Sequence, residues 1–363
     1  MLIPALREMP GKGTATMAEL AVKQLRWLKE NRLAGVRDLL SQRGLLLSPD
    51  VGALLNRMGP RGVLEAPWRL DAERQVGAAF GTSGPPTLVI KGVSLAWSLY
   101  PEPNQRLRTD MDLLVSPSGV EAARSVLRDL GYVPSYSVAG GTPTEEEAWR
   151  RRFGNEIHVV DLHWRLRGHP CLRDRLGFDE QFRASVGIEH LAPGIRGQGL
   201  VHALLTASMH WFDSLYAARY PLVWILDIDL LWRAMDSEQR EQLQALSVER
   251  GLSALVAENL AQAQECFNTP VEADYLEAMR EGGRGRRPTR LIALRQSPMR
   301  AHWFALRCEP DARARLRRLW RIFFPSARYL RERYPEGSRF GVVGLWGGRV
   351  RSRLKVQGSR SKE

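Results

Sequence analysis

The segment Leu88–Val115 constrains the fold of this chain more than any other part of the sequence. It reads LVIKGVSLAWSLYPEPNQRLRTDMDLLV and ends in a short apolar run in which Asp110 and Asp112 flank Met111. This run is typical of a buried strand, and side chains two residues apart on a strand share a face. Asp110 and Asp112 are therefore expected to project together. Two adjacent carboxylates repel each other unless a cation lies between them, and Mg²⁺ prefers oxygen ligands.

The beginning of the same segment predicts a phosphate site. A β-type run, residues 87–91, meets Gly92, and helical spacing follows from Val93. The free N–H groups and the dipole at a helix N-terminus favour an anion. The hydroxyl of Ser94, the charge of Lys91 and Arg106 in the following loop would add to this site. A lone D-x-D or a lone strand–glycine–helix turn is common without function, so the prediction depends on their joint occurrence.

A second strand, Glu156–Trp164, carries one acidic residue within an apolar run. Alternation places Asp161 and His163 on one face and Val160 and Leu162 on the other. A buried carboxylate needs a partner. If this strand lies beside the first, Asp161 completes a three-carboxylate cluster with Asp110 and Asp112; the alternative is a hydrogen-bonded structural Asp. His163 is interpreted as a phosphate contact, as a group that orients Asp161, or as a structural imidazole.

The periodicity of the chain predicts an α+β protein with a mixed sheet flanked by helices. Residues 1–80 are expected to form an N-terminal helical region, residues 81–192 the α/β core and residues 193–335 a C-terminal helical domain. Residues 336–363 are predicted to be a basic, flexible tail. Residues 140–152 are interpreted as a polar loop. Asp227 and Asp229 lie in a buried helix, where residues two apart do not face together, so this second D-x-D is not expected to bind metal.

Composition restricts the partners and the compartment. The net charge of +13 favours a polyanionic partner, although arginine used as an ordinary surface cation would give the same value. Cys171, Cys266 and Cys308 are far apart, which argues against a disulfide framework and a thiolate zinc site and fits a cytoplasmic protein. The N-terminus shows no secretory apolar run, and no segment is long enough for membrane insertion. The oligomeric state is left open.

The motifs resemble those of a bacterial family of uncharacterised nucleotidyltransferases within the DNA-polymerase-β-type superfamily. The resemblance covers residues 85–235 and depends on Leu88-Val89-Ile90-Lys91-Gly92, Leu99-Tyr100-Pro101, Arg106-x-x-x-Asp110-Met111-Asp112-Leu113-Leu114-Val115 and Asp161-Leu162-His163-Trp164; Phe323–Pro335 also resembles the end of that family. It implies two Mg²⁺ ions held by Asp110, Asp112 and Asp161. It further implies a glycine–serine turn, Gly92 and Ser94, that holds the triphosphate of an NTP.

The expected function is transfer of a nucleoside monophosphate from an NTP to an acceptor hydroxyl or phosphate, with release of pyrophosphate. Lys91 and Arg106 would stabilise the charge on the leaving group. The acceptor is expected to be anionic, with RNA, a protein and a phosphorylated peptide left open. The alternative is a catalytically inactive nucleotide-binding or scaffold protein with the same fold. Three intact aspartates argue against this alternative.

Overall fold

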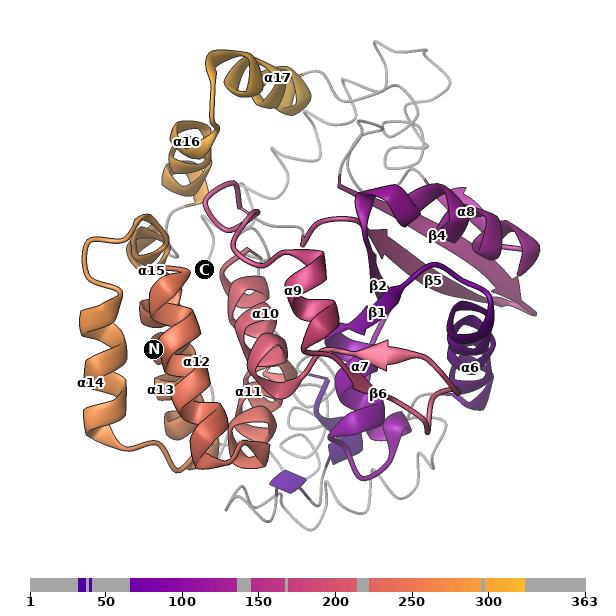
Figure 1. The fold of residues 1–363 in the computed structure, drawn as a ribbon, viewed down its shortest axis with the longest axis horizontal. Coiled ribbons are helices and arrows are strands. Elements are labelled where there is room, and N and C mark those ends of the chain that lie inside the picture. The colour runs from indigo at the N-terminus through magenta and orange to yellow at the C-terminus, as the bar shows by residue number, and fades with distance from the viewer. Residues whose placement is uncertain are drawn as a thin grey trace, which may run out of the picture.

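The fold is a mixed β-sheet with helices on both faces (Figure 1). It is seen in a computed structural model that describes residues 32–36, 39–40, 66–135, 145–166, 169–213, 222–294 and 298–323. The expectations for the basic tail, and for most of the N-terminal helical region, lie outside these residues. The α+β class predicted from periodicity is confirmed.

Over the residues that the structure describes, the sheet has seven strands in the order β3-β4-β5-β2-β1-β7-β6. Strands β1 and β2 are antiparallel, β2 and β5 are parallel, and β4 and β5 are antiparallel. Two short strands, β7 and β6, extend the sheet beyond β1. The strands span Thr87–Ile90 (β1), Met111–Val115 (β2), Val133–Ser135 (β3), Glu146–Phe153 (β4), Glu156–His163 (β5), Val186–Gly187 (β6) and Arg196–Gly197 (β7).

The register of the central strands decides which side chains meet. Asp112 on β2 lies directly beside Asp161 on β5, and Ile90 at the end of β1 lies on the other side of Asp112. Paired residues in a sheet point to the same face. The predicted adjacency of the two acidic strands, with Asp112 and Asp161 on one face, is therefore confirmed.

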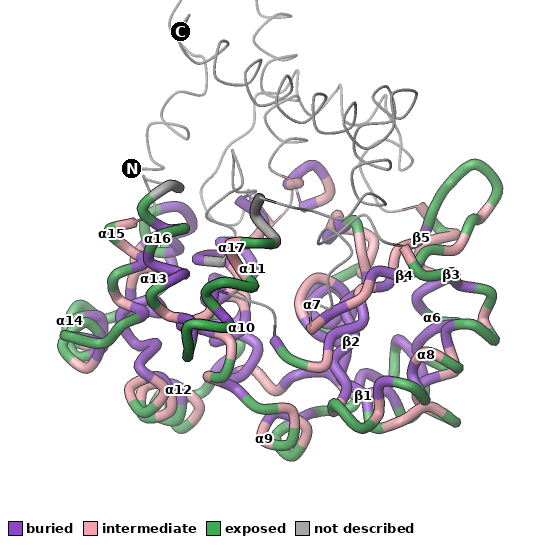
Figure 2. Tube along the Cα trace, turned by 90° about the horizontal axis from the view of Figure 1, so that it is seen from above, coloured by how far each residue is buried: buried purple, intermediate pink, exposed green. Residues whose placement is uncertain are grey.

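The two faces of the sheet belong to different cores. Val89, Leu113 and Val160 pack in a cluster with the helices α6 (Pro67–Thr82) and α8 (Val120–Asp129). The opposite face, which carries the aspartates, contributes Leu88 and Leu114 to a larger core shared with the C-terminal helices. Figure 2 shows the buried positions along β1 and β2 between these layers. The acidic cluster thus lies where the sheet meets the helical domain.

The C-terminal helices agree with the predicted periodicity. The helices α10 (Leu200–Asp213) and α11 (Val223–Ala234) lie nearest the sheet, and α11 is buried on nearly all sides as expected. Within the described ranges, no helix is long and apolar enough to cross a bilayer. The remaining helices are α7 (Lys91–Ser98), α9 (Phe178–Arg183), α12 (Ser237–Glu249), α13 (Ser253–Phe267), α14 (Ala273–Gly282), α15 (Arg290–Leu294), α16 (Pro298–Cys308) and α17 (Ala312–Phe323).

One prediction about local structure is wrong. The polar run that we interpreted as a loop, residues 140–152, contains most of β4, which pairs with β5 along its whole length. Its sequence, EEAWRRRF, has few apolar residues because much of this strand is only partly covered. Pairing with β5 still turns its first residue, Glu146, and Ala148 toward the face that carries Asp161, while Trp149 enters the opposite core. Tertiary pairing overrides weak local β-propensity here.

Candidate active site

Asp112 is the centre of the polar cluster. Its Oδ1 accepts a hydrogen bond from Lys91 Nζ at 2.6 Å and lies 2.8 Å from His163 Nε2. Burial alone would raise the pKa of this carboxyl group, but the charge of Lys91 and the contacts with His163 outweigh burial and lower it. Asp112 is thus held ionised and in a fixed orientation.

Asp161 is crowded by negative charge. Burial, and next the charges of Asp112, Asp110 and Glu146, raise its pKa to about 8, and Lys91 offsets this only in part. Its Oδ1 is buried and has no hydrogen-bond partner among the described residues. A buried carboxyl oxygen without a partner is costly, so this position has a physical reason to bind a cation.

Asp110 lies immediately before β2, at the entrance to the cluster. Burial, and next the charge of Asp112, raise its pKa, whereas Lys91 and Arg32 act in the opposite direction. Asp110 is partly exposed, unlike Asp112, which is buried. Asp161 is partly exposed as well, so both aspartates beside the buried Asp112 remain accessible from solvent.

His163 links Asp112 to a fourth acidic residue, Glu146. The Nδ1 atom of His163 lies 3.3 Å from Glu146 Oε2, while Nε2 faces Asp112. Both side chains are almost completely buried. This geometry supports an orienting role for His163, directed at Asp112 rather than at Asp161. Glu146 was missed from the sequence because its strand was interpreted as a loop; its pairing with β5 would have placed it on this face.

The turn from β1 into α7 has an unusual backbone. The strand ends at Ile90 and the helix begins at Lys91, so the break predicted at Gly92 lies one residue earlier. Lys91 has a φ of 55°, a left-handed conformation that residues with a side chain rarely adopt, and such strain clusters at functional sites. No side chain caps α7 among the residues that the structure describes, so its first N–H groups remain available for an anion.

Lys91 supplies the positive charge of the cluster. Burial opposes that charge, but attraction to Asp112 and their hydrogen bond, together with the charges of Glu146 and Asp110, raise its pKa. Its ammonium group bonds to Asp112 from the first turn of α7, which connects the carboxylates to the predicted phosphate site. The predicted phosphate site at the start of α7 and the carboxylates are therefore brought together.

Arg106 has a different environment from the one expected. Its Nε and Nη2 donate to the two carboxylate oxygens of Asp227 at 3.1 and 2.6 Å, and Nη1 donates to the Leu107 carbonyl. Tyr100 donates to the same aspartate at 2.7 Å. Arg106 thus ties the loop before Asp110 to α11, while its Nη1 lies 3.5 Å from where a Cβ on Gly92 would be. A phosphate-binding role for Arg106 remains a prediction.

Asp227 and Asp229 follow the expectation for a helix. Asp227 faces Arg106, whereas Asp229 accepts from Arg233 at 2.6 Å and from Thr269 at 2.8 Å. The two carboxylates therefore point to separate partners, as the helical spacing predicted.

Two further side chains complete the surroundings of the turn. Ser94 is buried, with Oγ 2.7 Å from where a Cβ on Gly197 of β7 would be, so it faces the sheet; its predicted phosphate contact stays a prediction. His210 of α10 was not assigned to the site from the sequence. Burial, and next the charge of Lys91, lower its pKa to about 3, so its imidazole is neutral.

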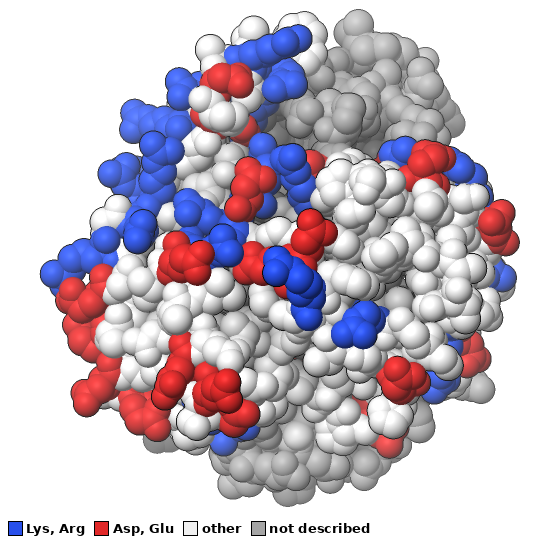
Figure 3. Space-filling view, viewed as in Figure 1, with Lys and Arg blue, Asp and Glu red and all other residues white. Residues whose placement is uncertain are grey.

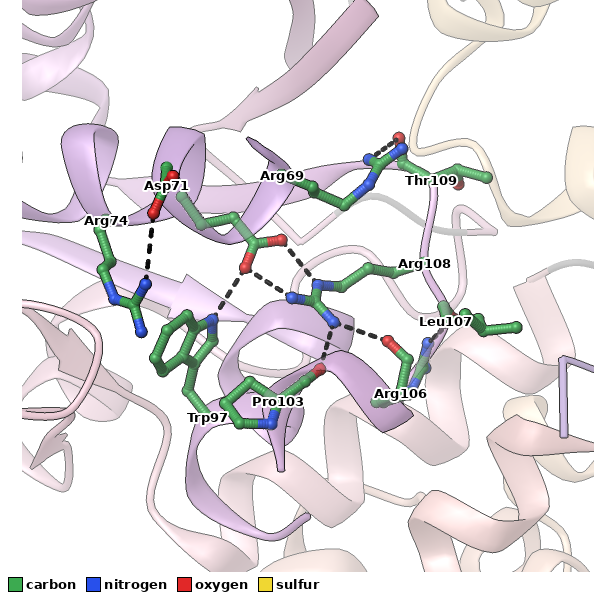
Figure 4. A network of polar contacts seen from close by, with 10 residues as sticks. Arg69, Asp71, Arg74, Trp97, Pro103, Arg106, Leu107, Arg108 and Thr109 are labelled. Carbon is green, nitrogen blue, oxygen red and sulfur yellow. Dashed lines mark hydrogen bonds and ion pairs between the residues drawn. The ribbon is translucent and has the colours of Figure 1, made fainter. Parts of the chain in front are cut away.

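A second ion-pair network fixes the loop that leads to Asp110 (Figure 4). Arg108 donates through Nε and Nη2 to both carboxylate oxygens of Glu73, at 2.7 and 2.6 Å, and through Nη1 to the Pro103 and Arg106 carbonyls. Trp97 of α7 donates to the same glutamate at 2.8 Å. The network therefore connects α6, α7 and the loop. Apart from Arg106 and Arg108, no residue in the sequence indicated this network.

The donor set fits a divalent cation. Asp112, Asp161 and His163 each offer a ligand atom, and these atoms all lie within 4.8 Å of one another. Asp110, two residues before Asp112 and just outside β2, adds a further carboxylate next to this group, although its oxygens are not among these atoms. Carboxylate oxygens are the ligands that Mg²⁺ prefers, and the unpartnered Asp161 oxygen is available to it. The cluster lies beside the uncapped start of α7, where a phosphate would fit.

The sequence matches a model of a known protein family. A family model described as "Uncharacterised nucleotidyltransferase" matches residues 69–268, more than half of the 363 residues. The matched range contains every residue of the acidic cluster and of the β1–α7 turn. No curated protein matches the chain.

Proposed function

Because the chain belongs to this nucleotidyltransferase family, we propose that it transfers a nucleoside monophosphate from an NTP to an acceptor hydroxyl or phosphate and releases pyrophosphate. The observation that carries the proposal is the parallel register of Asp112 and Asp161, which sets two carboxylates side by side with one buried oxygen unpartnered. Mg²⁺, held by Asp110, Asp112 and Asp161, would be the cofactor.

Bound Mg²⁺ would supply positive charge for the phosphates and lower the pKa of the acceptor oxygen. The chain's own residues prepare that site. Lys91 and His163 keep Asp112 ionised and oriented. Burial and the neighbouring carboxylates raise the pKa of Asp161 to about 8, which suits its carboxylate to take a proton from the acceptor.

The triphosphate would lie at the first turn of α7. Its uncapped N–H groups, the helix dipole and the absence of a side chain at Gly92 favour a phosphate there. Lys91 extends from this turn on a flexible side chain, so its ammonium group is able to exchange Asp112 for a phosphate oxygen. Arg106 already has Asp227 as a partner and would act mainly through its charge.

The charge distribution supports an anionic acceptor such as RNA, a protein or a phosphorylated peptide. Arginine side chains gather over α15, α16 and α17 on one face of the molecule (Figure 3). Trp303 and Trp320 are exposed on the same helices, 62% and 61% accessible. Exposed aromatic rings beside arginines suit nucleobase stacking, which is a feature that the sequence interpretation did not include.

The direct test is pyrophosphate release from labelled NTPs in Mg²⁺ buffer with host extract as the source of acceptor. Asp110→Ala should abolish release and transfer of label while leaving the melting temperature close to that of the parent. Asp129→Ala, which removes an exposed carboxylate from α8 on the far side of the sheet, is the matched control and should remain active.

Undiminished activity of Asp110→Ala would contradict the proposal. Mg²⁺-dependent NTP binding by the parent without pyrophosphate release from any of the NTPs would instead favour the inactive nucleotide-binding protein.

A further inference from the structure

A second cluster of metal-binding side chains lies away from the aspartates. His169 and Cys171 belong to the segment between β5 and α9, and Cys308 is the last residue of α16. These segments are far apart in the sequence but side by side in the fold, where the magenta segment approaches the helix (Figure 1). The wide spacing of the cysteines had argued against a thiolate site, and the fold removes that objection.

The three side chains converge on one point. His169 Nδ1 lies 3.1 Å from Cys171 Sγ, and ligand atoms of all three residues lie within 4.8 Å of one another. Phe304, one turn before Cys308 on α16, stacks on the imidazole with ring centroids 5.3 Å apart. His169 and Cys171 are buried, and Cys308 is partly exposed. The cluster is therefore ordered by packing on one side and open on the other.

A cavity of about 230 Å³ reaches the cluster from solvent. Cys171 and Cys308 line it together with Asp174, Arg175 and Arg287. The hydrogen bond with Cys171, and to a smaller extent the charge of Arg287, lower the pKa of Cys308 to about 7. The contact with Cys308 and burial raise the pKa of Cys171, and the charge of Arg175 opposes this rise only in part. The cavity gives an ion a way in, and it leaves room for a water molecule or another ligand beside the two sulfur atoms.

We propose that His169, Cys171 and Cys308 form a zinc site. Two thiolates and one imidazole are a donor set that Zn²⁺ prefers, with a fourth position completed by water or another oxygen ligand. Asp174, which lines the same cavity, is a candidate for such an oxygen. Mg²⁺ is excluded from this role because it selects oxygen ligands. On binding, the thiol protons are released to solvent.

The site would fasten α16 to the segment after β5. Glu309, the residue after α16, already pairs with Arg173 of that segment at 3.5 Å. It also pairs with Arg318 of α17 at 2.9 Å. Cys308 and Glu309 lie beyond residue 268, where the match to the family model ends. Zinc would therefore hold this chain's C-terminal helices against the nucleotidyltransferase core, independently of the Mg²⁺ site.

The test uses the full-length protein, reduced and stripped of metal, and does not depend on nucleotide transfer. Zn²⁺ is added back and bound metal is counted by mass spectrometry after gel filtration. Co²⁺ is added in parallel, since thiolate ligation gives it a near-ultraviolet charge-transfer band. Cys171→Ser, Cys308→Ser and His169→Gln are the test variants. Cys266→Ser, which removes a thiol from α13 away from the cluster, is the matched control.

We expect one equivalent of zinc per chain, a charge-transfer band with Co²⁺ and a higher melting temperature with Zn²⁺ for the parent and for Cys266→Ser. Each cluster variant should lose at least tenfold in zinc affinity, and Cys171→Ser and Cys308→Ser should also lose charge-transfer intensity, because each removes one thiolate. His169→Gln keeps both thiols and serves as a second kind of variant if a cysteine variant fails to fold. Less than stoichiometric zinc in the parent, an undiminished band in Cys308→Ser, or a Cys171–Cys308 disulfide with no metal uptake by the reduced protein would each overturn the proposal.

Discussion

Replacing Asp161 with asparagine should stabilise the metal-free protein. The pKa of Asp161 is raised from 3.8 to about 8 by burial and by the neighbouring carboxylates. In the unfolded chain this group ionises near its ordinary pKa, whereas in the folded protein it keeps its proton until the pH approaches 8. Unfolding therefore releases a proton between these values, and the free energy of unfolding falls as the pH rises through that window.

The magnitude follows from the linkage relation. Each pH unit between the two pKa values costs about 1.4 kcal/mol of stability, so the loss by pH 7 is at most about 4 kcal/mol. Movement of the Asp161 side chain toward water would reduce this loss of stability. Asparagine has no carboxyl group to ionise, so Asp161→Asn should recover most of this energy at neutral pH and little of it at pH 4. The variant should also lose the pH dependence contributed by this group.

Denaturant unfolding of the parent and of Asp161→Asn, in chelator and then in Mg²⁺ with an NTP analogue, measures the effect. In chelator at pH 7 the variant should be the more stable protein. With Mg²⁺ and the analogue the parent should gain stability and the variant should not, because binding to the folded state alone shifts the equilibrium. A variant that is less stable than the parent in chelator would refute this reasoning, since the carboxylate would then have a favourable structural partner.

Two further substitutions separate phosphate binding from structure. Gly92→Ala should change the free energy of unfolding by no more than about 1 kcal/mol, because the nearest atom to a Cβ there is Arg106 Nη1, at an ordinary 3.5 Å. The same substitution should weaken NTP binding in a nucleotide titration. Unchanged NTP affinity would contradict the proposal that this turn binds a phosphate. Asp227→Asn should cost about 3–5 kcal/mol in denaturant unfolding, because it leaves the buried Arg106 without its ionic partner, and a loss below about 1 kcal/mol would contradict this role.

The sequence was sufficient to predict which side chains share a face of a strand or a helix, because local periodicity determines this. Alternation along two strands placed Asp112, Asp161 and His163 on one face, and the observed register agrees. The helical spacing of Asp227 and Asp229 likewise separated their side chains. These predictions succeeded because each depends on the direction of a side chain from its own strand or helix.

Predictions that depended on long-range contacts were less complete. Glu146 was missed because a polar strand becomes recognisable only when its partner β5 is known. Arg106 is the partner of Asp227 in the structure, whereas the sequence analysis assigned Arg106 to the phosphate site. Cys171 and Cys308 meet only after the C-terminal helices pack beside the sheet, so their spacing in the sequence carried no such information.

The binding of Mn²⁺, a paramagnetic substitute for Mg²⁺, tests the acidic cluster most directly. Free Mn²⁺ is measured by electron paramagnetic resonance as the metal is titrated into protein with a non-hydrolysable NTP analogue. The parent should bind about two ions, as in other two-metal sites, and Asp112→Asn and Asp161→Asn should each lose at least one. Equal Mn²⁺ binding by the parent and both variants would show that these carboxylates do not hold the metal.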